Sequence, residues 1–266
     1  MPPSLLLLLL LAVLQGLTEF LPVSSSGHLV LARHFADNEA GFPEDASLEV
    51  WLHLGTLSAV LLYYRRRVSA LAQGVFGFGD DASAQRRLFL LLLLASVPAG
   101  LVGTVFEDSM SKLYASPESA GVALCLTGNA LWASRFLRSR RKTLTQITVG
   151  AALLIGVSQA LAIIPGISRS GVTIIAALAL GFEVQAAAAF SFLLSIPAIA
   201  GAALLKVPQI FSEGQSALPA THLGLSFALS AVVGYFALGL LVWTAKSRRL
   251  SWFAPYCWIA GLSVLL

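Results

Sequence analysis

Long apolar runs, each near the length that crosses a bilayer, dominate this sequence and restrict what it can fold into. Only 11% of the 266 residues are charged and 57% are hydrophobic, whereas soluble domains carry about 25% charged residues. A spanning helix needs about 20 mostly apolar residues. The runs lack the strict apolar/polar alternation that marks a membrane β-barrel. The sequence therefore predicts an all-α polytopic membrane protein.

The charge balance does not indicate a nucleic-acid partner. The net charge is +4, but the basic residues fall in short loops between apolar runs, where membrane topology places them. No basic stripe with interleaved aromatic residues occurs. Cys125 and Cys257 both lie in apolar segments, without a C-x-x-C pattern or zinc-ligand spacing, so we expect buried free thiols.

Eight apolar segments can be distinguished along the chain. Two of them, at about 4–36 and 147–181, are interrupted by polar turns and are long enough for a helical hairpin that enters the membrane and returns. The other six are predicted to span it. These predicted spans are 49–64, 88–106, 119–137, 185–205, 223–244 and 250–266.

The loop charges predict the orientation of these segments. Lys and Arg mark the cytoplasmic side. The basic loops all fall on one side of the membrane, and the other loops on the opposite side, only if both hairpins are re-entrant. The basic loops carry Arg65, Arg66, Arg67, Arg86 and Arg87; Arg135, Arg138, Arg140, Arg141 and Lys142; and Lys246, Arg248 and Arg249. Residues 1–266 then form one membrane domain with halves at about 1–140 and 145–266. Each half has one re-entrant hairpin and three transmembrane helices, in opposite orientations, as in an inverted repeat.

Each broken segment carries a polar island. The first reads QGLTEFLPVSSSGH from Gln15 to His28, and the second reads QALAIIPGISRSGVT from Gln159 to Thr173. In both, a Gln precedes the first Ser by nine positions, with a Pro between them and an S-x-S-G turn after it. Polar groups inside a membrane are costly and mark functional sites. Two related islands predict one site built from both halves.

The first island combines an acid, three hydroxyl groups and a histidine. Gln15 and Glu19 are four residues apart and share a helix face. Glu19 could reach the headgroups from a helix end, but Phe-Leu-Pro and a Ser cluster follow it instead of a loop. We therefore interpret Glu19 as a metal ligand or general base. Mg²⁺ and Ca²⁺ prefer oxygen ligands, so we expect one of these ions, with the Gln15 carbonyl oxygen as a second donor.

The serines and the histidine of this island have structural alternatives. Ser24, Ser25 and Ser26 suit the N-cap of the helix that follows, but capping explains one Ser better than three. A lone His is more often structural, yet the place of His28 beside this cluster favours acid–base or nucleophilic chemistry. The remaining histidines lie near loops or span starts and receive no role. They are His34, His53 and His222.

The second island points to an anion. A Pro165–Gly166 turn leads into a helix start that contains Arg169, and three hydroxyl groups accompany it, from Ser168, Ser170 and Thr173. Helix N-termini favour anions, and the Arg fork matches phosphate oxygens. Snorkelling of Arg169 to the interface is the alternative, but apolar runs flank it on both sides. The predicted ligand is a phosphate or diphosphate on a lipid-soluble molecule.

At these residues the chain resembles the undecaprenyl-diphosphate phosphatases, the bacitracin-resistance family of bacterial membrane enzymes. The islands match the family motifs (E/Q)-x-x-x-E and P-G-x-S-R-S-x-x-T, and FSFLLSIP at 190–197 also looks like a family segment. The resemblance covers essentially the whole chain. It implies hydrolysis of a C55 polyprenyl diphosphate to the monophosphate needed for cell-wall recycling, with bacitracin resistance. It also implies a multi-pass protein of the bacterial inner membrane, with the site open to the periplasmic side.

The resemblance also implies roles for individual residues. The metal-associated positions map to Gln15 and Glu19, although the family often has Glu at position 15. The catalytic histidine maps to His28, the nearby hydroxyl group to Ser25, and the phosphate-binding arginine to Arg169. Further phosphate-binding hydroxyl groups are Ser24, Ser26, Ser168, Ser170 and Thr173, and Glu49 matches an accessory acid. Whether a Ser, His28 or water attacks phosphorus stays open.

Two other functions are alternatives to a phosphatase. An inverted repeat is also found in transporters, so a polyprenyl-phosphate transporter or flippase with the same anion site is the alternative. A protein that both hydrolyses and flips the lipid stays open, as does a homodimer. A transporter needs an anion site but does not need Glu19 and His28 to converge on it. A non-catalytic scaffold leaves Glu19 and Arg169 without a purpose. We therefore favour a membrane phosphatase.

Overall fold

The computed structural model describes residues 4–36, 46–79, 81–106, 113–137, 141–212, 218–247 and 249–266. Within these ranges the regular secondary structure is helical, apart from one isolated bridge between Lys142 and Phe182. Cys125 and Cys257 are free, as expected, and Cys257 is buried while Cys125 is half-buried. The all-α class predicted from the sequence is confirmed.

The first broken segment is a helical hairpin, α1 (Leu5–Phe20) followed by α2 (Ser25–Phe35). Pro22 lies in the turn between them. Ser24 caps α2 by accepting a hydrogen bond from the Gly27 N–H, so the Ser cluster begins this helix as its composition predicts. Ser24 has a φ of 70°, a left-handed conformation that a non-glycine residue adopts only under local constraint.

The second broken segment repeats this arrangement. Helices α8 (Val149–Leu161) and α9 (Arg169–Ala179) are joined by the turn that contains Pro165 and Gly166. Thr148 caps α8 and Ser168 caps α9. The expected hairpin at 147–181 therefore forms, with Arg169 as the first residue of its second helix.

Among the described residues, three helices are long and apolar enough to cross a membrane: α5 (Ala82–Val105), α11 (Ala220–Lys246), and residues 184–206 of α10 (Val184–Ser212). Helices α3 (Ala46–Tyr63) and α7 (Pro117–Ala133) overlap two more predicted spans. The last predicted span differs from expectation. There, η3 (Leu250–Phe253) precedes α12 (Ala254–Leu262), whose 9 residues extend only about 14 Å. Pro255 occupies the first turn of α12, where the ring suits a helix start and not its interior.

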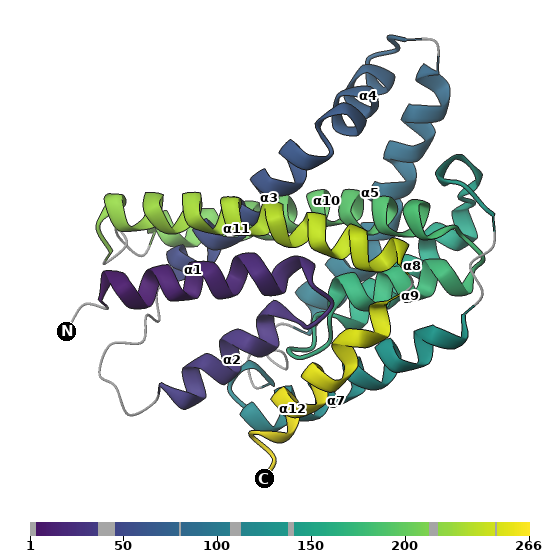
Figure 1. The fold of residues 1–266 in the computed structure, drawn as a ribbon. Coiled ribbons are helices and arrows are strands. Elements are labelled where there is room, and N and C mark those ends of the chain that lie inside the picture. Colours follow the sequence, from purple (N-terminus) through teal and green to yellow (C-terminus); the bar gives the residue numbers. More distant parts are fainter. Residues whose placement is uncertain are drawn as a thin grey trace.

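One basic segment expected to be a loop contains a helix. Helix α4 (Arg65–Val75) starts directly after α3 and packs against α5. In Figure 1, α4 and the start of α5 stand out from the helix bundle. The three arginines at its start lower the hydropathy without opposing helix formation, because Arg is a good helix former. Short 3₁₀ turns η1 (Ser134–Phe136) and η2 (Leu144–Gln146) follow α7.

Small residues bring the central helices close together. Helix α11 packs on α1 and α3, while α10 packs on α3, α5 and α9; Figure 1 shows α11 alongside α1. A Cβ added at Gly16 would lie 2.8 Å from the Val233 Cβ, and one added at Gly55 would lie 2.5 Å from the Phe227 carbonyl oxygen. Such close approach of backbones is typical of helix packing in membranes.

The order of elements follows the predicted plan. A hairpin (α1 and α2) precedes α3, α5 and α7, and a second hairpin (α8 and α9) precedes α10, α11 and α12. The inverted relation between the two halves stays a prediction.

Candidate active site

The tips of the two hairpins touch each other. The Gly166 N–H of the second tip donates to the Ser24 Oγ of the first at 3.1 Å. A Cβ added at Gly27 would lie 2.8 Å from the Gly166 Cα, so the tips meet backbone to backbone. The two polar islands, far apart in sequence, thus lie in one cluster, which is the arrangement that their pairing predicts.

Helix α7 braces this contact through Thr127, a residue that sequence reasoning missed. The Thr127 hydroxyl donates to the Gly166 carbonyl oxygen at 2.7 Å and accepts from the Ser168 N–H at 3.1 Å. The side chain is buried. Nothing around Thr127 in the sequence signals this role, since a Thr within an apolar run usually bonds to its own helix.

Glu19, near the end of α1, is the centre of the cluster. Its Oε2 accepts from the Ser25 hydroxyl at 2.6 Å and from Gln15 Nε2 at 3.0 Å. Its Oε1 forms an ion pair with Arg169 of the second hairpin. The carboxyl group is almost fully buried, so these partners replace water as the groups that stabilise its charge.

Arg169 lies at the N-terminus of α9, where its backbone is held by the neighbouring hydroxyl groups. Ser168 Oγ accepts from the Gly171 N–H at 3.2 Å, and Ser170 Oγ donates to the Leu21 carbonyl oxygen at 3.4 Å. The Thr173 hydroxyl donates to the Arg169 carbonyl oxygen at 2.7 Å. These buried hydroxyl groups position the start of α9, and their contact with phosphate stays a prediction.

His28 is buried one turn into α2 and has a partner on each ring nitrogen. Its Nδ1 lies 2.7 Å from the Ser24 carbonyl oxygen and its Nε2 lies 2.7 Å from the Tyr256 hydroxyl. A carbonyl oxygen can only accept, so we place the proton of a neutral ring on Nδ1, which leaves Nε2 to accept from Tyr256. The two rings stack with their planes 1° apart. Sequence reasoning missed Tyr256, because only packing brings α12 to this site.

His53 of α3 also reaches the cluster, although the sequence gave it no role. Its Nε2 lies 3.8 Å from Glu19 Oε2. Its Nδ1 lies 2.8 Å from the Glu49 carbonyl oxygen. The Glu49 side chain instead pairs with Lys206 Nζ at 3.0 Å, where both side chains are 42% exposed. The four-residue spacing of Glu49 and His53 was the one available signal that they share a helix face.

Ser26 lies at the less buried edge of the first tip. Its hydroxyl is 3.3 Å from the Ser24 hydroxyl, and the residue is half-buried. Ser24 already bonds to both tips, so Ser26 is the serine of this pair with more access to a ligand.

The donors around Glu19 fit a hard cation that is partly coordinated by substrate. Gln15 Oε1 is buried and finds no hydrogen-bond partner among the described residues. Those residues contain no group of three or more His, Cys, Asp or Glu side chains able to enclose a metal. Mg²⁺ commonly binds through one or two carboxylates together with substrate phosphates, which is the donor set that Glu19 and Gln15 would offer.

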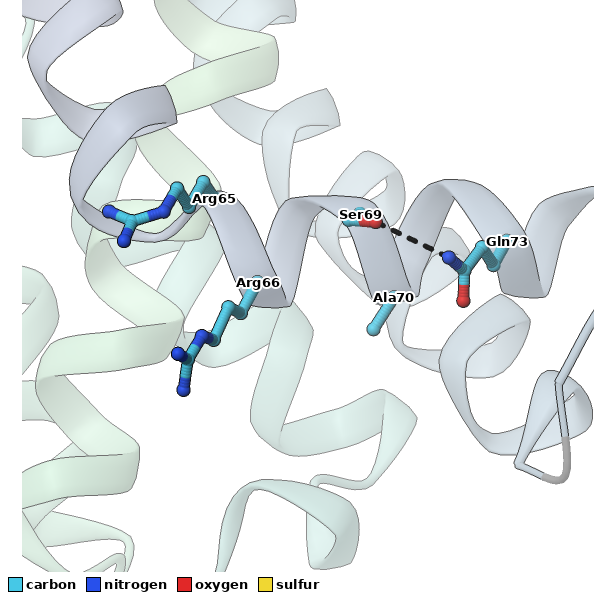
Figure 2. Close-up of a pocket in the computed structure, with 5 residues that line it drawn as sticks. All are labelled: Arg65, Arg66, Ser69, Ala70 and Gln73. Atoms are coloured by element: carbon cyan, nitrogen blue, oxygen red, sulfur yellow. Dashed lines mark hydrogen bonds between the residues drawn. The ribbon is translucent and has the colours of Figure 1, made fainter.

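A separate hollow lies on α4, and it does not share the residues of this cluster. Figure 2 shows its lining residues, Arg65, Arg66, Ser69, Ala70 and Gln73, and the hydrogen bond from Gln73 to Ser69. The hollow has cationic groups but no carboxylate among its lining residues. It therefore lacks the acid and arginine pair that distinguishes the hairpin tips.

The chain is similar to known proteins over nearly its whole length. The family model described as bacitracin resistance protein BacA matches residues 8–263. The undecaprenyl-diphosphatase of Desulfatibacillum aliphaticivorans is 44% identical over 97% of this chain and 96% of its own length. The proteins of the same name from Desulforapulum autotrophicum (42%, over 95% and 94%) and Halothermothrix orenii (39%, over 96% and 95%) are also similar.

Proposed function

The chain belongs to the bacitracin resistance protein BacA family, and we propose that it hydrolyses undecaprenyl diphosphate to undecaprenyl phosphate and inorganic phosphate. The observation that carries this proposal is the contact of Glu19 with both Ser25 and Arg169 where the hairpin tips meet. The names of the similar proteins favour a phosphatase over a flippase. The product is the lipid carrier that cell-wall synthesis uses again.

Arg169 binds the terminal phosphate in this proposal. Its Nη2 bonds to Glu19, and a guanidinium group has five N–H donors in a planar fork, so the remaining donors can hold phosphate oxygens. The start of α9 also favours a phosphate at this place, because the free N–H groups of a helix N-terminus attract anions. In the water-poor tip region such charge-assisted bonds are strong.

Ser25 and Glu19 form the reacting pair. A hydroxyl group 2.6 Å from a carboxylate has the geometry of a nucleophile and its proton acceptor. Ser25 Oγ attacks the terminal phosphorus while Glu19 takes its proton, and the bond from that phosphorus to the bridging oxygen breaks, so that undecaprenyl phosphate leaves. Water then attacks the phosphorylated Ser25, which releases inorganic phosphate and returns the proton to the Ser25 oxygen. We assign the His28–Tyr256 pair to proton transfer, because its short hydrogen bond can pass a proton.

A Mg²⁺ or Ca²⁺ ion would be held by Glu19 and the Gln15 oxygen, and would neutralise charge on the diphosphate. Gln15 also orients Glu19 through its Nε2 hydrogen bond.

We place this activity in the bacterial inner membrane, with the site open to the periplasmic side. The long apolar helices α5, α10 and α11 support a multi-pass protein. The sequences at 37–45 and 107–116 contain one basic residue, Lys112, and this scarcity of Lys and Arg supports an outward opening.

Phosphate release from undecaprenyl diphosphate by the purified protein tests the proposal. Ser25→Ala should lower the rate about 10²-fold or more, on the scale of general-base contributions. Ser69→Ala on α4 is the matched control and should keep the wild-type rate. A wild-type protein that releases no phosphate, but moves the lipid between the leaflets of a vesicle, would instead establish the transporter function.

A further inference from the structure

His53 directs its Nε2 toward the Glu19 carboxylate. Its Nδ1 lies 2.8 Å from the Glu49 carbonyl oxygen, and a carbonyl oxygen only accepts hydrogen bonds, so the ring proton is on Nδ1. In the neutral ring the Nε2 lone pair then faces Glu19 Oε2 across 3.8 Å. This distance is too long for a hydrogen bond, and two acceptors that face each other repel unless a cation or a proton lies between them.

The same arrangement is found in histidines that bind metals. Such a histidine almost always donates its other ring N–H to a carbonyl or carboxylate oxygen, which fixes the ring and its tautomer. In this chain the Glu49 carbonyl oxygen accepts that N–H. Because this oxygen belongs to the backbone of α3, the orientation of His53 is part of the helix and does not depend on a second side chain.

A third acceptor belongs to the same neighbourhood. Gln15 donates through Nε2 to Glu19 Oε2 at 3.0 Å, while its Oε1 is buried without a partner among the described residues. An orphaned buried acceptor is costly. Glu19, Gln15 and His53 are therefore neighbouring residues of α1 and α3 that carry three electron-pair donors, of which Gln15 Oε1 and His53 Nε2 accept no hydrogen bond among the described residues.

We propose that His53 Nε2 is a ligand of the divalent-cation site, beside Glu19 and the Gln15 oxygen. The inference rests on the proposed function, because it deepens the cation site of that function. A nitrogen ligand changes what the site prefers. Imidazole suits the later transition cations best, and affinity for nitrogen ligands rises from Mn²⁺ to Co²⁺, whereas Ca²⁺ prefers oxygen alone. His53 should thus strengthen the binding of Mn²⁺ or Co²⁺ more than that of Ca²⁺.

Mn²⁺ binding to the purified full chain tests the proposal by electron paramagnetic resonance. Pulsed spectra of bound Mn²⁺ should show a directly bonded ¹⁴N in the wild type, and His53→Gln should remove it. We expect His53→Gln to weaken Mn²⁺ binding about 10-fold or more, on the scale of lost ligand support, with a smaller change for Ca²⁺ measured by competition. His34→Gln is the matched control, since His34 is exposed near the end of α2 and contacts Phe35. It should leave both signals unchanged.

The possible outcomes separate this inference from the proposed function. An unchanged nitrogen signal in folded His53→Gln would show that His53 is no ligand, whatever the rate of phosphate release. A wild type that binds no Mn²⁺ would overturn the inference as well, and phosphate release in excess chelator would then show that hydrolysis needs no cation. If His53→Gln loses the nitrogen signal and the wild type releases no phosphate, the cation site is supported and the hydrolase is rejected.

Discussion

At the scale of single residues, the pairing of Arg169 with Glu19 links the two hairpins. In the proposed function, phosphate binds the donors of the Arg169 fork that this pair leaves available. Lys keeps the charge but offers neither the fork nor two parallel hydrogen bonds. The geometry of the guanidinium group is therefore as important here as its charge.

We accordingly expect Arg169→Lys to lower the rate of phosphate release about 10²-fold or more, the scale for removal of one transition-state donor. Arg65→Lys on the exposed start of α4 is the matched control and should retain the wild-type rate. Rates are to be compared at equal amounts of folded protein. A near wild-type rate for Arg169→Lys would show that Arg169 does not hold the reacting phosphate.

A second residue-scale prediction concerns the cation. Glu19 contributes the carboxylate of the first island, while Gln15 contributes only an amide oxygen. Glu19→Ala should abolish activity, and Gln15→Ala should reduce it less, because a neutral amide is the weaker ligand. Titration of Mg²⁺ and Ca²⁺ into chelated protein measures the requirement. Full activity of the wild type in excess chelator would remove the cation from the mechanism.

At the scale of elements, the hairpin tips depend on backbone conformations that only certain residues allow. Gly166 has a φ of 99°, and a Cβ there would lie 2.7 Å from the Ala123 Cβ of α7. Both the left-handed conformation and the close contact exclude a larger residue without local movement. Because Ser24 and Thr127 bond to the backbone of Gly166, such movement would disturb both tips.

Gly166→Ala should thus lower the free energy of unfolding by about 1–3 kcal/mol, the usual cost of a strained backbone position, and should also reduce phosphate release. Gly150→Ala is the control within α8, since a Cβ added at Gly150 meets no atom within 4 Å. It should be neutral or slightly stabilising, because Ala is the better helix former. Thermal unfolding in one detergent compares the two variants. Equal midpoints for them would contradict the described tip geometry.

At the scale of the whole molecule, the predicted topology places the two ends of α7 on opposite sides of the membrane. This helix has 17 residues and is about 26 Å long. Ala115 lies before it and Thr145 after it, both exposed. The charge pattern of the loops assigns Ala115 to the outside and Thr145 to the cytoplasm.

Labelling of single cysteines tests this assignment. In a background with Cys125→Ala and Cys257→Ala, an impermeant maleimide added to right-side-out vesicles should modify Ala115→Cys at once. It should modify Thr145→Cys only after the membrane is opened. Reaction of both from the same side would reject the inverted-repeat topology.

The features predicted from sequence were those encoded locally. Apolar runs identify membrane helices because a helix that crosses the bilayer needs about 20 mostly apolar residues in succession. The two hairpins followed from Pro, Gly and Ser cap signals at 22–27 and 165–171, which determine local backbone geometry. Even the joint site was foreseeable, since Glu19 and Arg169 lie in matching islands within apolar segments.

Other features depended on which helix faces pack together, and periodicity does not reveal this. Thr127, Tyr256 and His53 join the site from α7, α12 and α3, and each lies in a segment whose local sequence resembles ordinary membrane helix. The helix at α4 and the short α12 also differed from the predicted loop and span. A residue's chemistry is set by its type, but its partners are set by close packing between distant segments, and only the tertiary structure decides that packing.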